Sequence, residues 1–198
     1  MAFSPLIPKD QSLNPYCMYW KGQYFMDTRL PFGLRSAPKL FTALADAVQW
    51  LIKEKGVDFC IHYLDDYLFI EPPDVHAEAL VAATQTLAEL GIPMAPDKVE
   101  GPVTCLTFLG IELDSQTLTA QLPADKLQRL TSMMVEWQDQ KFCTKRELLS
   151  LIGVLQHATM VVRSGRVFLR RMIELAKLPK EYHHRVRLNR EFRSDLQW

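Results

Sequence analysis

Two adjacent aspartates, Asp65 and Asp66, interrupt an apolar run that extends from Cys60 to Ile70. Polar residues at the centre of such a short run favour two strands joined by a tight turn, so the segment predicts a β-hairpin with both carboxylates at its turn. Neighbouring negative charges are unfavourable in apolar surroundings unless a cation compensates them. Mg²⁺ is suited to that role because it binds carboxylate oxygens and fills its other positions with water and phosphates. A solvated Asp-Asp turn is the alternative interpretation.

The rest of the chain alternates between strand and helix patterns. Aromatic residues on both sides of Lys21-Gly22 predict a hairpin over residues 16–26, and a further strand pair is expected over residues 105–113. We expect an α+β arrangement up to about residue 121 and an all-α arrangement after it. The first predicted helix begins after Ser36 and ends at Gly56, and the second begins after Asp74 and ends at Gly91. Pro123 opens a third helix, the capping box Thr144–Glu147 begins a fourth, and Pro179 follows the last one.

Each predicted helix has an apolar face at a spacing of three or four residues, and we expect these faces to form the core. The faces comprise Leu40, Leu44, Ala47, Val48 and Leu51; Ala77, Leu80, Thr84 and Leu87; Leu127, Leu130, Met134 and Trp137; Leu148, Leu151, Ile152 and Leu155; and Phe168, Leu169, Met172 and Ile173.

The net charge of the chain is zero, but the charges are unevenly distributed. Residues 1–140 carry 10 Lys and Arg against 18 Asp and Glu, a net charge of −8, whereas residues 141–198 carry 13 against 5, a net charge of +8. Such asymmetry indicates two surfaces with different partners. Arg163, Arg166 and Arg170 would share one helix face that could follow a phosphate backbone. A solvated helix face is the alternative.

Composition excludes several classes of protein. A hydrophobic fraction of 48% excludes a disordered tail and a collagen-like fibre. No apolar run reaches the roughly 18 residues that a membrane span needs. The four cysteines, Cys17, Cys60, Cys105 and Cys143, form no Cys-x-x-Cys pair, which disfavours a zinc site or a disulfide framework. We expect reduced, mostly buried thiols in an intracellular protein of the cytoplasm or nucleus.

Several motifs together resemble those of reverse transcriptases, the RNA-directed DNA polymerases. Tyr63-Leu64-Asp65-Asp66 is similar to their catalytic motif, and residues 30–38 are similar to the loop and helix start beneath the nascent base pair. Residues 62–66 and 165–171 look most like eukaryotic retrotransposons, with those mobilised by a tyrosine recombinase as one candidate group. Further similar segments, in the family's order, are Ala2-Phe3 at the N-terminus, Leu90–Ile92 with Lys98, and Phe108–Ile111.

The resemblance implies a polymerase palm over residues 1–121 and a basic, helical thumb or connection region over residues 122–198. The implied partners are an RNA or DNA template–primer duplex, deoxynucleoside triphosphates and two Mg²⁺ ions, with Mn²⁺ as a substitute. By this resemblance, Asp65 and Asp66 bind the metal ions and act in catalysis, and Lys98 protonates or neutralises the leaving phosphate. Substrate contacts are implied for Phe3, Phe32, Gly33 and Arg35, and primer contacts for Phe108, Leu109 and Gly110. Contacts to the phosphate backbone of the duplex are implied for Arg163, Arg166 and Arg170. For Lys98 an exposed loop lysine is the alternative, and for Phe3 a core side chain.

One part of the family pattern has no counterpart here. The first palm motif of the family begins with a metal-binding aspartate four positions before the alanine matched by Ala2, and that position precedes Met1. We therefore expect the 198-residue chain, which also lacks the fingers region, not to polymerise DNA by itself. The alternatives are a non-catalytic nucleic-acid-binding relic or co-opted module, and a purely structural interaction domain. In related elements a ribonuclease H domain and a recombinase or integrase accompany this region.

Overall fold

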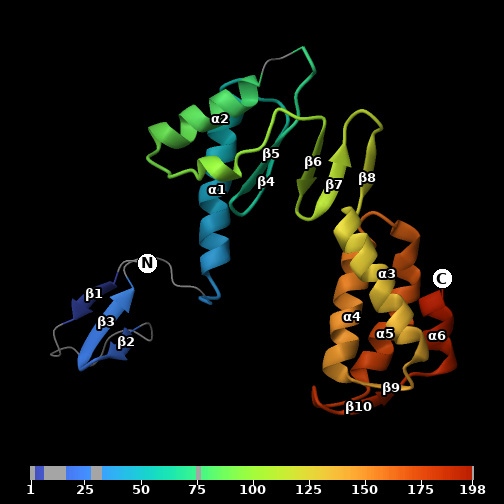
Figure 1. Cartoon of the computed structure of the whole chain (residues 1–198). Helices are drawn as coiled ribbons and strands as arrows, with labels where there is room; N and C mark the ends of the chain where they lie inside the picture. The colour runs from blue at the N-terminus through green and yellow to red at the C-terminus, as the bar shows by residue number, and fades with distance from the viewer. Residues whose placement is uncertain (1–2, 7–16, 28–32, 75–76, 198) are drawn as a thin grey trace. The chain divides into compact units, whose positions relative to one another are not determined.

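We describe the chain from a computed structural model, in which residues 3–6, 17–27, 33–74 and 77–197 are described. The chain packs into two units, Met1–Pro102 and Val103–Trp198, and each is treated by itself (Figure 1). The first unit contains β1 (Phe3–Leu6), β2 (Cys17–Trp20), β3 (Gln23–Asp27), α1 (Ala37–Glu54), β4 (Cys60–Tyr63), β5 (Asp66–Phe69), α2 (Glu78–Glu89) and the 3-10 turn η1 (Pro96–Lys98).

The hairpin expected over residues 16–26 is confirmed as β2 and β3. Lys21 and Gly22 form its two-residue turn, and both have positive φ angles, +48° and +78°. Positive φ at both central residues matches the right-handed twist of the flanking strands. β1 pairs with the other edge of β3 and was not predicted from the sequence. Pro5 lies in β1, and proline is tolerated in an edge strand because no ladder hydrogen bond is lost on its outer side.

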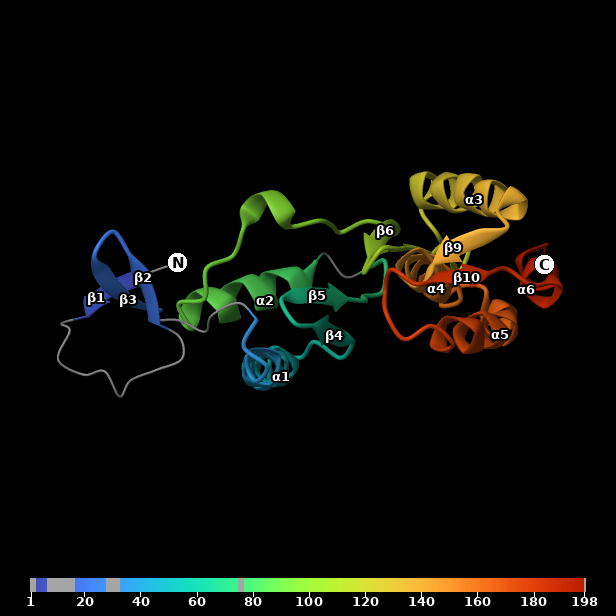
Figure 2. The same ribbon diagram turned by 90° about the horizontal axis from the view of Figure 1, so that it is seen from below.

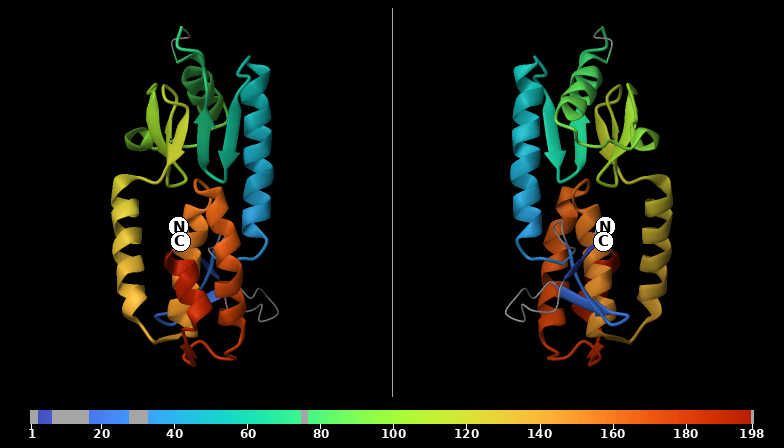
Figure 3. Two further views of the ribbon diagram at one scale, coloured as in Figure 1. Left: turned by 90° about the vertical axis from the view of Figure 1, so that its right-hand side faces the viewer. Right: turned by 90° about the vertical axis from the view of Figure 1, so that its left-hand side faces the viewer.

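α1 packs against the hairpin of β4 and β5, and Figure 3 shows the two running side by side. Its buried face consists of Ala45, Val48 and Ile52, so only Val48 of the predicted face is fully buried. Leu40 and Leu44 were predicted to be in the core, but 54% and 51% of their surfaces are exposed. Helical periodicity alone did not distinguish the two apolar faces, because large side chains occupy both. The surrounding core cluster contains Val48, Ile52, Val57, Cys60, Ala79 and Ala83.

α2 begins with a cap that differs from the prediction. Asp74 was expected to cap this helix, but Ala77 occupies the N-cap position with φ +56° and offers no side-chain acceptor. The backbone N–H of Ala79 instead donates to the Glu71 Oε1 atom at 2.6 Å, so a glutamate eight residues upstream satisfies this free donor. Gly91 follows the end of the helix with φ +65°, as predicted.

The predicted apolar face of α2 is wrong in detail. Its buried residues are Ala79, Ala83 and Thr86, whereas Leu80 and Thr84 are only half-buried. Small residues face α1 because the two helices pack closely in this unit. Thr86 tolerates burial because its hydroxyl donates to the Ala82 carbonyl at 2.7 Å.

The second unit combines a three-stranded antiparallel sheet, ordered β6-β7-β8, with four helices and a two-stranded ribbon. Figure 2 shows the short strands β9 and β10 lying side by side. The elements are β6 (Cys105–Phe108), β7 (Ile111–Asp114), β8 (Thr119–Gln121), α3 (Ala124–Asp139), β9 (Phe142–Thr144), α4 (Lys145–Ala158), η2 (Arg163–Gly165), α5 (Arg166–Lys177), β10 (Arg185–Arg187) and α6 (Arg190–Gln197).

The capping box predicted at Thr144 is confirmed. The Thr144 hydroxyl accepts a hydrogen bond from the Glu147 backbone N–H at 3.2 Å, and the Thr144 N–H donates to Glu147 Oε2 at 2.7 Å. Both backbone donors at the start of α4 are thereby satisfied. The hydrogen bonds from Thr144 lower the pKa of the Glu147 carboxyl, because they favour its charged form.

The core of the second unit lies between its helices. The predicted faces of α4 and α5 are confirmed at Leu148, Leu151, Ile152, Leu169 and Met172, all of which are buried. The predicted burial of Leu127 on α3 is wrong, since 52% of its surface is exposed. α6, β9 and β10 were not predicted, and they contribute further core residues: Cys143, Val186, Phe192 and Leu196. The region predicted to be all-α therefore contains a short β-ribbon.

Packing places the β6–β8 sheet in the same unit as the helices, whereas the sequence grouped residues 103–121 with the preceding palm. The functional boundary after residue 121 stays a prediction. The free thiols of Cys60 and Cys143 are buried, and that of Cys105 is exposed. Among the described residues, the structure contains no helix long and apolar enough to cross a membrane.

Candidate active site

The two predicted metal ligands lie at the Tyr63–Asp66 turn of the first unit. Tyr63 pairs with Asp66 across the hairpin, which leaves Leu64 and Asp65 as the two turn residues. Leu64 has φ +53°, a conformation that side chains with a Cβ rarely adopt. Such a backbone costs about 1–3 kcal/mol and persists only where the surrounding structure imposes it. The hairpin predicted from the sequence is thus confirmed, with Asp65 in a strained turn and Asp66 at the first position of β5.

The two carboxylates are exposed and available to a ligand. Within the described part of the chain, neither makes a hydrogen bond or an ion pair. Unpaired neighbouring carboxylates suit a hard divalent cation, which binds one or two of them and takes its other oxygens from water and phosphate. No group of three or more His, Cys, Asp or Glu side chains gathers in metal-binding geometry among the described residues. Asp65 and Asp66 therefore fit Mg²⁺ as a partial ligand set.

Three hydrogen bonds fasten the hairpin to α1: Gln49 donates to the Cys60 carbonyl at the far end of β4, and one further bond comes from each strand beside the turn. His62 Nε2 on β4 lies 3.0 Å from the Asp46 carboxylate, and Tyr67 on β5 donates its hydroxyl to the Ala45 carbonyl at 3.3 Å. Burial raises the pKa of the Tyr67 phenol, and the neighbouring Cys60 and Asp46 raise it further, so the hydroxyl stays protonated as a donor. Asp46 and Tyr67 were not singled out from the sequence, because nothing in their local pattern distinguishes them.

Of the other predicted site residues, those that the structure describes form no hydrogen bond or ion pair with Asp65 or Asp66. Phe32 and the side chain of Phe3 lie outside the described residues. Arg35 and Lys98 are exposed, and in the part of the chain that is described neither bonds to a carboxylate of the turn. Gly33 has φ +85°, which explains a glycine at the entrance to α1.

The predicted primer-contact motif, Phe108–Ile111, forms a tight turn in the second unit. Phe108 pairs with Ile111, and Leu109 and Gly110 between them both have positive φ, +49° and +77°. Side chains from two helices bind the exposed carbonyls of this turn. Lys126 Nζ on α3 donates to the Gly110 carbonyl at 3.2 Å, and His157 Nε2 on α4 lies 3.3 Å from the Leu109 carbonyl. Sequence analysis missed both residues.

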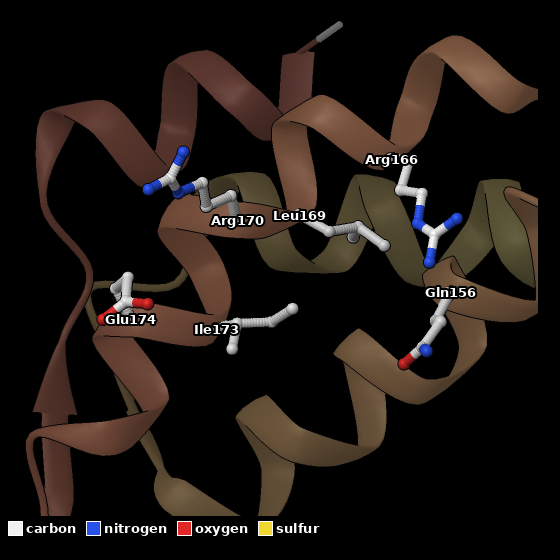
Figure 4. A pocket seen from close by; sticks show the side chains of 6 residues that line it. All are labelled: Gln156, Arg166, Leu169, Arg170, Ile173 and Glu174. Atoms are coloured by element: carbon white, nitrogen blue, oxygen red, sulfur yellow. The ribbon is translucent and has the colours of Figure 1, made fainter.

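Two of the three predicted backbone-binding arginines, Arg166 and Arg170, line one hollow of about 320 Å³ between α4 and α5 (Figure 4). In Figure 4, Arg166 points toward Gln156 of α4, while Arg170 extends on the other side of Leu169. Arg163 lies in η2, before α5 begins, and is not part of the lining. The arginines are exposed, as contact with a solvated phosphate backbone requires.

A family model, described as "Reverse transcriptase (RNA-dependent DNA polymerase)", matches residues 7–113, more than half of the chain. The chain belongs to the reverse transcriptase family. A curated relative is Polyprotein P3 of Commelina yellow mottle virus, which is 29% identical over 131 residues. That match covers 65% of this chain and 6% of the polyprotein.

Solved structures agree on the fold of this reverse transcriptase domain. The foamy viral protease-reverse transcriptase in complex with dsDNA matches with a TM-score of 0.65 and 20% identity over 92% of this chain and 35% of that one. The same viral protein in complex with an RNA/DNA hybrid matches with a TM-score of 0.64 and 20% identity over 98% of this chain and 24% of that one. At this identity the likeness shows the mixed helix-and-sheet fold alone. The chain spans about a third or less of these proteins.

Proposed function

We propose that this chain is part of a polymerase that adds deoxynucleotides to a primer on an RNA or DNA template, with Asp65 and Asp66 as its metal ligands. The observation that carries the proposal is the pair of free, exposed carboxylates at the strained Tyr63–Asp66 turn of a reverse transcriptase domain. A solvated turn would gain nothing from a leucine at positive φ, because a glycine there would cost less.

The chemistry assigned to the site is phosphoryl transfer. Two Mg²⁺ ions, when bound, activate the primer 3′-hydroxyl and stabilise the leaving pyrophosphate. Asp65 and Asp66 would hold these ions. Lys98, exposed on η1, is proposed to neutralise or protonate the pyrophosphate. Arg35 follows Gly33 at the entrance to α1 and is proposed to contact the triphosphate, together with Phe32; Phe3 is proposed to screen the sugar.

The duplex would be held by the second unit. The Leu109-Gly110 turn, with Phe108, is proposed to support the primer end. Arg166 and Arg170 beside their hollow, with Arg163 ahead of them, are proposed to contact phosphates. The foamy viral proteins were solved with dsDNA and with an RNA/DNA hybrid, which supports a duplex as the partner of this chain.

Metal-dependent nucleotide binding tests the assignment of the carboxylates. The chain should bind a deoxynucleoside triphosphate in the presence of Mn²⁺, and Asp65→Ala should abolish that binding. Equal binding by both proteins would show that the turn holds no metal, and would favour a non-catalytic duplex-binding module. No third acid gathers beside Asp65 and Asp66 among the described residues, and this observation keeps that second candidate in view.

Primer extension tests catalysis separately. We expect the chain alone not to extend a labelled primer, because among the described residues no third acid joins Asp65 and Asp66 to complete a two-metal site. Incorporation that disappears in Asp65→Ala would contradict this expectation and establish the chain as an active polymerase.

Salt-dependent duplex binding tests the arginines. Replacing Arg166 and Arg170 by Gln should weaken binding to an RNA/DNA hybrid and reduce the slope of log affinity against log salt by about two. Arg146→Gln is the matched control, because this exposed arginine lies in the first turn of α4, about 15 Å along the helix from Gln156. If the double variant and the control behave alike, the hollow is not a phosphate contact.

The source of the domain is also a proposal. We infer a retrotransposon, with a tyrosine-recombinase element as one candidate, from residues 62–66 and 165–171. The polyprotein relative is viral, so a viral origin is the alternative. Either source would supply further domains, such as ribonuclease H and a recombinase or integrase, and would act inside a cell.

A further inference from the structure

The imidazole of His62 is buried, and His62 lies on β4 one residue before the Tyr63–Asp66 turn. Only 6% of its side chain is exposed, whereas its partner Asp46 on α1 is 65% exposed. His62 Nε2 donates to Asp46 Oδ1 at 3.0 Å, because a carboxylate can only accept. The pair therefore joins a buried group on the catalytic hairpin to a carboxylate that water can reach.

The second ring nitrogen of His62 forms no hydrogen bond within the described part of the chain. Among the described residues, Nδ1 is the buried side-chain nitrogen or oxygen that lacks a hydrogen bond. Buried polar atoms are almost always paired, so an exception requires a reason for retaining the residue. An apolar side chain at position 62 would remove the unpaired atom, but it would also remove the bond to Asp46. The bond to α1 is the property that an apolar residue could not replace.

The neighbouring strand has a parallel attachment. Tyr67 is the direct cross-strand partner of His62, and their ring centroids are 5.4 Å apart. The Tyr67 hydroxyl donates to the carbonyl of Ala45, which adjoins Asp46 in sequence. Both strands of the hairpin are thus bonded to the same turn of α1, immediately before and after the residues Tyr63–Asp66.

We propose that Asp46 and His62 are positioning residues, which hold the Tyr63–Asp66 turn in the strained conformation that presents Asp65 and Asp66 to a metal ion. The proposal rests on the proposed function of these two carboxylates. Leu64 at φ +53° relaxes unless the strands beside it are fixed, and the His62–Asp46 bond fixes β4 one residue before the turn. Neither residue touches the metal or the substrate in this assignment.

The test uses substitutions that keep or remove the bond. Asp46→Ala and His62→Leu remove it, whereas Asp46→Asn keeps an acceptor oxygen and His62→Gln keeps a side-chain N–H donor. Lys55→Met is the matched control, because it breaks the 2.8 Å ion pair between Lys55 and Glu89, which joins the end of α1 to α2. Since Asp46 is largely exposed, Asp46→Ala should fold even if His62→Leu does not.

The first readout is Mn²⁺ affinity, measured from the free-ion electron paramagnetic resonance signal. Residues that orient metal ligands typically contribute tenfold or more to affinity, so we expect Asp46→Ala and His62→Leu to weaken Mn²⁺ binding about tenfold. Asp46→Asn, His62→Gln and Lys55→Met should stay close to the unsubstituted chain.

The second readout is amide hydrogen exchange at residues 63–66, which does not depend on a metal. Faster exchange there in Asp46→Ala, with unchanged exchange in α2, would support the positioning role. Unchanged exchange at the turn would overturn it, as would unchanged Mn²⁺ affinity in a chain whose Mn²⁺ binding is lost in Asp65→Ala. If the unsubstituted chain and Asp65→Ala bind Mn²⁺ equally, the proposed function fails, and hydrogen exchange alone decides the positioning role.

Discussion

Arg171 on α5 donates two hydrogen bonds to the carboxylate of Asp195 on α6, through Nε to Oδ2 at 2.8 Å and through Nη2 to Oδ1. The Asp195 side chain is 1% exposed and that of Arg171 is 55% exposed. This arginine is therefore committed to joining two helices, unlike Arg166 and Arg170, which line the hollow on α5.

Breaking this pair should destabilise the second unit. Arg171→Met would leave the buried Asp195 carboxylate uncompensated, and we expect the free energy of unfolding to fall clearly, although water screens part of the interaction because the arginine is half-exposed. Urea unfolding followed by circular dichroism measures the change. Lys177→Met, which breaks an exposed ion pair with Glu174 on the same helix, should cost less than about 0.5 kcal/mol. Equal losses in the two variants would contradict the assignment.

Gly110→Ala should strain the turn that is proposed to hold the primer. Gly110 has φ +77°, which costs an alanine about 1 kcal/mol, and a Cβ there would lie 2.0 Å from Lys126 Nζ. The lysine must then move and lose its bond to the Gly110 carbonyl. Gly56→Ala is the control, because Gly56 has φ +92° but open space around it. Adding Lys126→Met should cost less in the Gly110→Ala background than alone; additive costs would show that the bond survives.

The stability of the second unit should decline in alkaline solution. Burial raises the pKa of the Cys143 thiol from 9.0 to about 11, with Glu147 adding to the effect. The folded state thus favours the protonated thiol, so its contribution is complete below pH 9 and is lost as the pH rises from 9 to about 11. Unfolding measured between pH 8 and 11 should show this decline in the unsubstituted chain and a smaller one in Cys143→Ala. Identical slopes would refute it.

The Thr144 capping box should stabilise α4 measurably. Thr144→Ala removes the acceptor for the Glu147 N–H, and we expect a loss of about 1 kcal/mol in the free energy of unfolding. Thr131→Ala is the control, because that exposed hydroxyl donates only to a carbonyl within α3. A loss no larger than in the control would mean that the cap contributes nothing.

Sequence reasoning succeeded where the signal was local. The capping box at Thr144 and the turn at Lys21-Gly22 depend on a few adjacent residues, and both are present as predicted. The hairpin that carries Asp65 and Asp66 was likewise predictable, because apolar runs flank its two acids. The family assignment followed from the order of such local motifs.

Prediction from the sequence failed where a residue's bonding partner lies far away along the chain. Glu71 rather than Asp74 satisfies the start of α2, because the path of the intervening loop decides which acid reaches the helix. The bond between Asp46 and His62 depends on how the hairpin packs on α1, which no local pattern encodes. Apolar periodicity also misassigned Leu40 and Leu127, since a helix with large side chains on two faces does not reveal which face is buried.

The attachment of the Leu109-Gly110 turn has a mechanical consequence. Lys126 on α3 and His157 on α4 bind its carbonyls, and the β9 strand separates these two helices along the chain. A sliding or rolling of α3 against α4 would pull the two carbonyls in different directions and twist the hairpin tip. The position of this turn is thus set by two helices at once, because each of them binds a different carbonyl.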